Sequence, residues 1–391
     1  MQPAQLTKNS TSGGVQQNIS LAFKLARPLL ILFVCIIHMP SIEGFSSDHD
    51  QFDQPLTLAA VFFKDVVARG AVPILSVIAG YLAYSSYVRR KSFGYFVKTK
   101  ASRLLLPFIV WSCISLIIGL IVNKLTGHNP GGVTDAFNIF GFFDGMLGLT
   151  RVPFNPPIYY LRDLFFLMVA VPLIHHFCRS KWIMLGLLLA YLSYFLVFTQ
   201  DLPGFIVPYG EAGKFFVITY RWDSAIFFTL GYFFAYRALS LPETNFLIDF
   251  PVAMYLIILS AVLTMLLSIY NPTGFPFTPW RAGFGVIFVL ALPTIFNTLL
   301  RTKDTWFGRL LNFLSPYSFI LFLSHTPTST IYYWAVKSGI GLNITERSPL
   351  VQQFLYGICY LVFCTLMAIA IRHTWKAIKP NKTRTNAAPA R

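Results

Sequence analysis

Charged side chains are scarce in this 391-residue chain. Lys, Arg, Asp and Glu together make up 12% of it, against roughly 25% in soluble domains. Hydrophobic residues make up 55%. This composition excludes a water-soluble enzyme and also a disordered protein, which would be polar and highly charged. A spanning helix needs about 20 mostly apolar residues, so the chain holds at most about ten.

Cysteine is also rare, and no part of the chain alternates steadily between apolar and polar residues. Continuous apolar runs such as 185–198 exclude a transmembrane β-barrel, whose strands alternate. The cysteines have no metal-ligand spacing and lie in or at the ends of apolar segments, so we expect small apolar residues without disulfides and no bound metal. They are Cys35, Cys113, Cys178, Cys359 and Cys364.

Acidic residues are few, 15 against 31 basic ones, which gives a net charge of +16. Basic residues collect in cytoplasmic loops of membrane proteins. With the N-terminus placed inside, most of the basic residues and few of the acidic ones fall on the cytoplasmic side. The sequence has no basic stripe with interleaved aromatic residues, so we expect no nucleic-acid partner. The excess charge therefore predicts a topology in which both termini are cytoplasmic.

We predict an all-α, polytopic membrane helix bundle with about ten transmembrane helices. Residues 1–20 form a polar tail without a cleavable signal peptide, 21–375 the membrane domain and 376–391 a basic cytoplasmic tail. The longest outer loop is 124–157. The expected helices span roughly residues 24–42, 71–88, 103–123, 158–177, 182–199, 222–238, 249–270, 281–301, 312–336 and 351–372.

Burying an ionisable residue inside a membrane segment costs free energy, so each such residue is a candidate functional residue. Arg27 and His38 are eleven residues apart, which places them on one helix face about 16 Å apart. A cation at the cytoplasmic mouth and a titratable base three turns inward suit a ligand with an anionic head and a reactive far end, such as acyl-coenzyme A. The alternative is a snorkelling arginine and a structural histidine.

A second cluster is cationic and cytoplasmic. Lys98, Lys100 and Arg103 precede an apolar run, and such residues bind phosphates through charge-assisted hydrogen bonds. The alternative is the positive-inside rule alone.

Polar residues also lie at the start of one later helix and within another. Tyr160, Arg162 and Asp163 form either a polar wall for a hydroxylated acceptor or an aromatic belt with a local ion pair. Ser318 and His325 are seven residues apart and share a helix face. There the alternative is a core histidine satisfied by its neighbours.

Six motifs in order resemble the acyltransferase-3 family of integral-membrane O-acyltransferases. They are Arg27 with His38, and residues 70–82, 100–107, 158–164, 228–232 and 318–325. The resemblance covers about residues 21–372, nearly the whole chain. There are three departures from the family pattern: Ala79 replaces Ser, the pair Tyr159–Tyr160 replaces Trp-Phe, and Lys100 replaces Arg. Lysine keeps the charge of arginine but loses its bidentate fork.

The resemblance implies transfer of an acyl group, usually acetyl, from cytoplasmic acetyl-CoA to a hydroxyl of a glycan or lipid-linked sugar, in the bacterial inner membrane. His38 would then be the general base or acyl carrier, with Arg27 beside the donor. Lys98, Lys100 and Arg103 would hold the nucleotide end. The acceptor side would use the remaining polar candidates, Tyr160, Arg162, Asp163, Ser318 and His325.

Two other functions use the same residues. A transporter or flippase for a glycan lipid or small organic ion would place these charges along a substrate path, without any need for CoA. A non-catalytic sensor or scaffold would not depend on His38 or Arg27.

Overall fold

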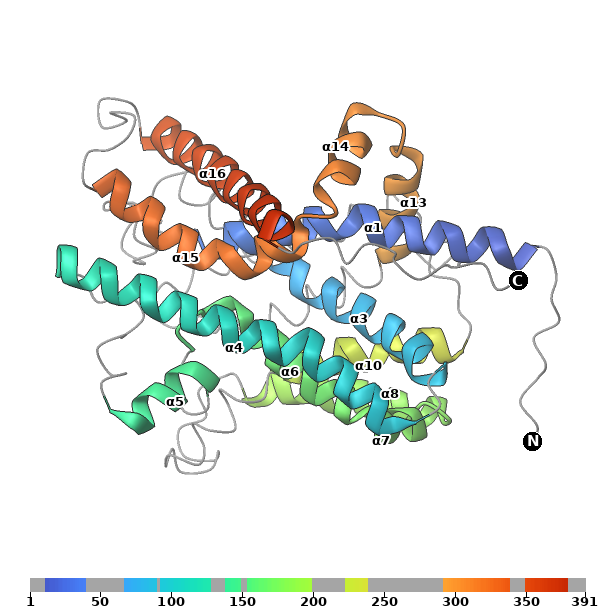
Figure 1. Ribbon diagram of the computed structural model, residues 1–391. Coiled ribbons are helices and arrows are strands. Elements are labelled where there is room, and N and C mark those ends of the chain that lie inside the picture. The colour runs from blue at the N-terminus through green and yellow to red at the C-terminus, as the bar shows by residue number, and fades with distance from the viewer. Residues whose placement is uncertain are drawn as a thin grey trace, which may run out of the picture.

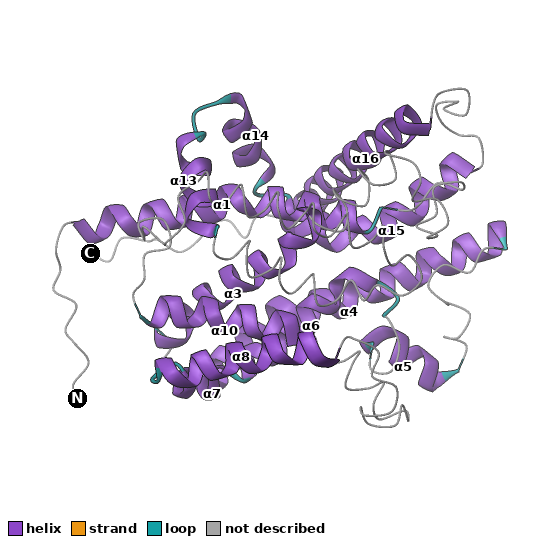
Figure 2. Cartoon of the chain, turned by 180° about the vertical axis from the view of Figure 1, so that it is seen from behind, coloured by secondary structure: helices purple, strands orange, loops and turns teal. Residues whose placement is uncertain are grey.

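The computed structural model describes residues 11–39, 67–89, 92–127, 138–148, 153–198, 222–237, 291–337 and 349–378. Within these ranges all regular secondary structure is helical (Figures 1 and 2), which confirms the predicted all-α class for this part of the chain. The elements are α1 (Thr11–Ile37), η3 (Ala68–Gly70), α3 (Ala71–Val88), α4 (Phe93–Thr126), α5 (Ile139–Leu147), η5 (Pro156–Ile158), α6 (Tyr159–Val169), α7 (Val171–Phe177), α8 (Lys181–Phe198), α10 (Trp222–Tyr236), α13 (Leu292–Arg301), α14 (Trp306–Leu314), α15 (Ser318–Lys337) and α16 (Pro349–Ile378).

Four described helices are long and apolar enough to cross a membrane. They comprise Asn18–Ile37, Ala68–Val88, Phe93–Thr126 and Leu355–Ile378, and the bent pair α6–α7 would be a fifth span. These helices support an integral membrane protein. The predicted segment 249–270 and the first part of 281–301 lie outside the described residues, so the ten-helix topology stays a prediction.

Two segments predicted as single helices are broken in the structure. Residues 158–177 form α6 and α7, which meet at an angle of 62° just before Pro172. Residues 312–336 are divided between α14 and α15 by a turn at residues 315–317, which contains Pro316. Proline removes a backbone donor and crowds the carbonyl one turn earlier, so each helix ends next to the proline.

Helices α3 and α10 pack backbone to backbone. A Cβ atom on Gly80 would collide with the carbonyl oxygen of Phe228, and one on Gly231 would collide with the carbonyl oxygen of Val77. Glycines allow this close approach, as small residues do between membrane helices. The sequence motifs at 70–82 and 228–232 therefore contribute to helix packing.

Helix α1 lies against α3, α13, α14, α15 and α16 (Figure 1). Its side chains Phe23, Leu30 and Val34 are buried in the largest apolar core cluster. Helix α15 in turn packs between α4 and α16. The end of α1 therefore meets the middle of α15 inside the bundle, and this crossing positions the candidate site.

Candidate active site around a histidine pair

Two histidines from distant parts of the sequence meet at this crossing. His38 follows the last residue of α1, and its backbone N–H still donates to the carbonyl oxygen of Val34 at 3.3 Å. His325 lies in α15 and is completely buried. The centroids of the two imidazole rings are 5.7 Å apart. The structure thus brings together two residues that the sequence analysis singled out separately.

The orientation of His325 is set by its own helix. Its Nδ1 lies 2.8 Å from the carbonyl oxygen of Phe322. A carbonyl can only accept, so Nδ1 donates, and Nε2 is left as the acceptor of a neutral imidazole. This Nε2 atom is buried and makes no hydrogen bond within the described residues.

Other buried polar atoms near His325 also make no hydrogen bond within the described part of the chain. They are Ser324 Oγ, Thr326 Oγ1 and Asn155 Oδ1. Each such atom costs about 1–3 kcal/mol if nothing satisfies it. Native proteins keep few of them, so a cluster calls for an explanation. Ser324 and Thr326 flank His325 on α15, and Asn155 bonds to that helix, so each could hydrogen-bond a polar group that entered here.

Asn155 is a site residue that the sequence analysis missed. Its Nδ2 donates to the carbonyl oxygen of Leu323 at 3.1 Å, and its side chain is fully buried. In an α-helix that carbonyl would accept from the residue four positions later, but Pro327 has no N–H. Asn155 therefore supplies the donor that Pro327 removes, and it ties the turn before α6 to α15 two residues from His325.

Tyr160 joins the same group through aromatic contacts. Its ring meets that of Phe322 edge-on at 6.3 Å, and Phe322 lies 6.1 Å from the ring of His325. Its hydroxyl accepts a hydrogen bond from Ser76 at 3.4 Å. Of the predicted acceptor residues, Tyr160 and His325 therefore share Phe322 as a neighbour.

Arg162 and Asp163 face elsewhere. Arg162 donates from Nε and Nη2 to Oδ1 of Asp163, at 2.9 and 2.7 Å, and both residues are buried. Its Nη1 donates to the carbonyl oxygens of Leu147 and Gly148 at the end of α5. These bonds fasten α5 to α6, which is the geometry of a structural clamp.

Ser318 lies at the other end of α15. It donates to the carbonyl oxygen of Ser315 at 2.8 Å, and seven residues, about 10 Å of helix, separate it from His325. The structure does not join it to the histidine pair.

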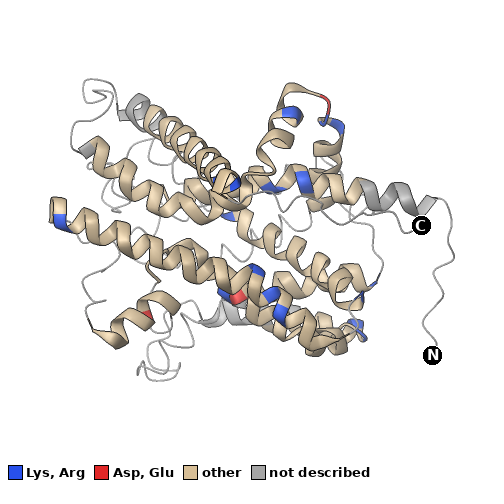
Figure 3. Ribbon diagram, viewed as in Figure 1, with Lys and Arg blue, Asp and Glu red and all other residues tan. Residues whose placement is uncertain are grey.

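The predicted donor-binding cations lie in the first turns of α4 and in the middle of α1, helices whose basic residues are blue in Figure 3. Lys98 and Arg103 are exposed on α4, and Lys100 Nζ is 5.3 Å from the ring centroid of Phe96. Arg27 is exposed on α1, eleven residues before His38. Along α1 the distance from Arg27 to His38 is about 16 Å.

Helix α4 also contributes to the interior. Ser112 and Ser115 are buried, and their hydroxyls make no hydrogen bond within the described residues. They follow Arg103 by about 13 and 18 Å of helix, close to the 16 Å between Arg27 and His38. No group of three or more metal-ligating side chains occurs in the described ranges.

Comparison with known proteins gives two matches. A family model described as an acyltransferase domain matches residues 21–373. The succinoglycan biosynthesis protein ExoH of Rhizobium meliloti (strain 1021) is 29% identical over 159 residues. That alignment covers 40% of this chain and 42% of the relative. No solved structure matches.

Proposed function

Because the chain belongs to the acyltransferase family whose model spans residues 21–373, we propose that it is a membrane O-acyltransferase. It would move an acyl group from cytoplasmic acyl-CoA to a hydroxyl of a cell-surface glycan or lipid-linked sugar. The relative is named for the biosynthesis of a polysaccharide, succinoglycan, which supports an acceptor of this class. Acetyl is the proposed acyl group, and the bacterial inner membrane the proposed location.

The observation that carries this proposal is the histidine pair, in which His325 is completely buried and His38 half-buried, together with buried polar atoms that make no hydrogen bond within the described residues. His38 and His325 lie ring to ring at 5.7 Å. Ser324 and Thr326 flank His325 on α15, and Asn155 bonds to the same helix; each has a buried polar atom without a hydrogen bond in the described part of the chain. A structural histidine in an apolar bundle would be satisfied by its neighbours, whereas His325 Nε2 makes no hydrogen bond within the described residues and could accept one from a substrate.

In the proposed reaction the imidazole of His38 takes the proton of the acceptor hydroxyl. The alcohol oxygen attacks the thioester carbonyl carbon, the carbon–sulfur bond breaks, and the proton passes to the leaving thiolate to give free CoA. In the variant mechanism His38 itself carries the acyl group before the alcohol receives it. His325 Nε2 accepts a hydrogen bond and so holds the acceptor hydroxyl, while Tyr160 limits the space beside it.

The cations on α1 and in the first turns of α4 support a cytoplasmic nucleotide site. Arg27 on α1 and Lys98, Lys100 and Arg103 on α4 would hold the phosphates of CoA. An extended arm would then run about 16 Å along α1, or somewhat further along α4, to reach the polar interior. A path from the cytoplasmic side into the bundle is consistent with the proposed topology of ten spans and two cytoplasmic termini.

The test is release of CoA from acetyl-CoA by the full chain in nanodiscs, with succinyl-CoA as a second donor. The wild type is expected to release CoA. His38→Ala should lower the rate by about 10²–10⁴-fold, the usual contribution of a general base. His176→Ala, at an exposed histidine on α7, is the matched control and should keep the wild-type rate.

Two outcomes would contradict the proposal. A folded His38→Ala variant with full turnover would remove His38 from the mechanism. A wild type that neither binds nor cleaves either donor, but moves a lipid-linked sugar across the bilayer, would establish the transporter alternative.

A further inference from the structure

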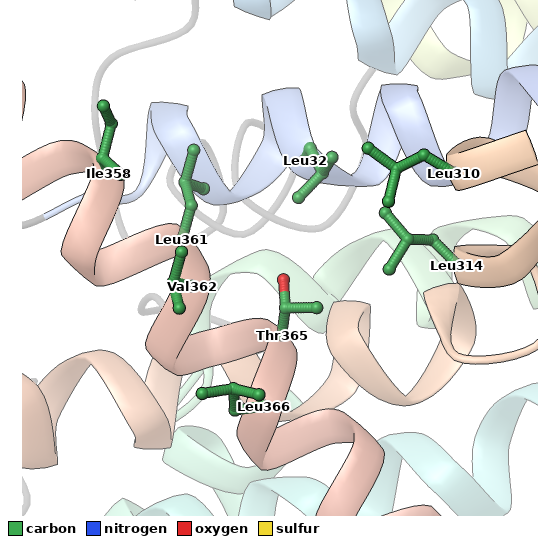
Figure 4. Close-up of a pocket in the computed structure, with 8 residues that line it drawn as sticks. All are labelled: Leu32, Leu310, Leu314, Ile358, Leu361, Val362, Thr365 and Leu366. Carbon is green, nitrogen blue, oxygen red and sulfur yellow. The ribbon is translucent and has the colours of Figure 1, made fainter. Parts of the chain in front are cut away.

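An apolar groove runs along the outside of the bundle, away from the histidine pair. It has a volume of about 340 Å³ and lies between α1, α14 and α16. Figure 4 shows its lining, in which the hydroxyl of Thr365 is the one oxygen drawn. The lining residues are Leu32, Leu310, Leu314, Ile358, Leu361, Val362, Thr365 and Leu366.

The groove is open to the surroundings of the bundle. Val362 and Leu366 keep 51% and 58% of their surface exposed. Since α16 is one of the four apolar candidate spans, this face meets the hydrocarbon of the bilayer. A flexible alkyl chain is the shape that fits such a surface.

One end of the groove carries positive charge. Arg372 and His373 follow Thr365 and Leu366 by seven residues, so they lie on the same face of α16, about 10 Å further along. The Arg372 guanidinium lies over the ring of Tyr317 at 5.0 Å, and His373 Nε2 is 3.4 Å from the hydroxyl of the same tyrosine. Tyr317 thus holds both side chains at the point where the apolar lining ends.

This end lies at the level of the membrane surface. Trp306 at the start of α14 and Trp375 on α16 are 71% and 63% exposed. Exposed tryptophans collect at the membrane–water interface. The α13–α14 hairpin stands out from the bundle beside this end of α16 (Figure 1) and carries further basic residues (Figure 3).

We propose that the groove binds an anionic phospholipid, with one acyl chain along α16 and the phosphate beside Arg372 and His373. An apolar channel that ends in cations complements a molecule with an alkyl tail and a phosphate head. The proposal does not depend on acyl transfer, since the groove lies on the outer surface and the histidine pair is inside.

The experiment uses phosphatidylglycerol with a photoactivatable diazirine in one acyl chain, added to the delipidated full chain in detergent. Cross-links are expected on the peptides of α16 and α14 that line the groove. Unlabelled phosphatidylglycerol should compete about fivefold better than phosphatidylcholine with the same chains. That ratio corresponds to the ~1 kcal/mol that one basic residue contributes next to anionic lipid.

Two kinds of variant distinguish binding of the lipid phosphate from binding of its acyl chain. Arg372→Gln should abolish the preference for phosphatidylglycerol, and Arg372→Lys should retain it. Leu366→Trp, which fills the groove, should reduce cross-linking by both lipids. Lys181→Gln and Leu189→Trp on α8 are matched controls at an exposed cation and an exposed leucine, and both should behave as the wild type.

Three results would overturn the proposal. The first is cross-linking outside the groove, or variants at Arg372 and Leu366 that match the wild type. The second is stronger competition by a polyprenyl phosphate than by phosphatidylglycerol, which would assign the groove to a lipid-linked sugar. The third is cross-linking to a second copy of the chain that Leu366→Trp abolishes, which would make the groove a dimer interface.

Discussion

At the scale of single residues, the two histidines of the site are held in different ways. The ring of His325 is oriented by a hydrogen bond from its Nδ1 to its own helix. His38 follows the last residue of α1 and is half-buried. In the proposed mechanism the oriented Nε2 of His325 positions the substrate hydroxyl, and the imidazole of His38 transfers the proton or carries the acyl group. The proposal therefore gives the two residues separate roles.

This division predicts different responses to substitution. His325→Ala should lower kcat/KM for the acceptor about ten- to hundredfold, the value of a lost hydrogen bond to a reacting group. His325→Gln should restore much of it, because the glutamine side-chain oxygen can accept in place of Nε2. Kinetics with varied acceptor would show the change, while the KM for acyl-CoA should stay constant. If glutamine were as inactive as alanine, His325 would instead be needed to carry a proton.

At the scale of helices, periodicity placed some elements well and could not place others. The segment predicted at 71–88 coincides with α3, because its apolar run is bounded by clear breakers. Helix α4 begins at Phe93, ten residues before the prediction, since Ser92 caps it by accepting from the N–H of Tyr95. Helix α5 was missed inside the loop predicted at 124–157. It is short, and hydrogen bonds from Arg162 to the carbonyl oxygens at its end hold it in place. A hydropathy pattern cannot reveal such contacts.

The same limit applies to the site. His38, His325 and Tyr160 could be found from the sequence because polar residues in apolar segments are conspicuous. Asn155 could not, since it lies in a polar loop and its role depends on contact with α15. The signal that was available is Pro327, which leaves the carbonyl of Leu323 without its helical donor.

That compensation predicts a coupled pair. Asn155→Ala should destabilise the protein by about 1–3 kcal/mol, because the buried carbonyl of Leu323 then has no donor. In the double variant Asn155→Ala with Pro327→Ala, the new N–H at position 327 can bond to this carbonyl. The loss from Asn155→Ala should therefore shrink when Pro327 is already alanine.

Thermal unfolding of the four proteins in detergent measures this double-mutant cycle. Asn297→Ala, at an exposed asparagine on α13, is the control and should be neutral in both backgrounds. Purely additive effects of Asn155 and Pro327 would show that the hydrogen bond does not depend on the proline.

At the scale of the whole molecule, charge and helix length together orient the bundle. Helix α4 has 34 residues, about 51 Å, whereas the hydrocarbon core is about 30 Å thick. In the proposed topology its first turns, which carry Lys98, Lys100 and Arg103, extend beyond the hydrocarbon on the cytoplasmic side, where basic residues collect. The hairpin of α13 and α14, with Arg301, Lys303 and Arg309, belongs to the same side in this topology, and α5 to the opposite one.

This orientation predicts which residues a membrane-impermeant maleimide can reach. Phe140→Cys on α5, where the native side chain is 85% exposed, should be labelled in spheroplasts. Lys303→Cys, in the exposed turn between α13 and α14, should be labelled only after lysis. The unaltered chain gives the background from its five cysteines, three of which are buried. Labelling of Lys303→Cys in intact spheroplasts would invert the topology and move the proposed CoA site to the side of the membrane that lacks CoA.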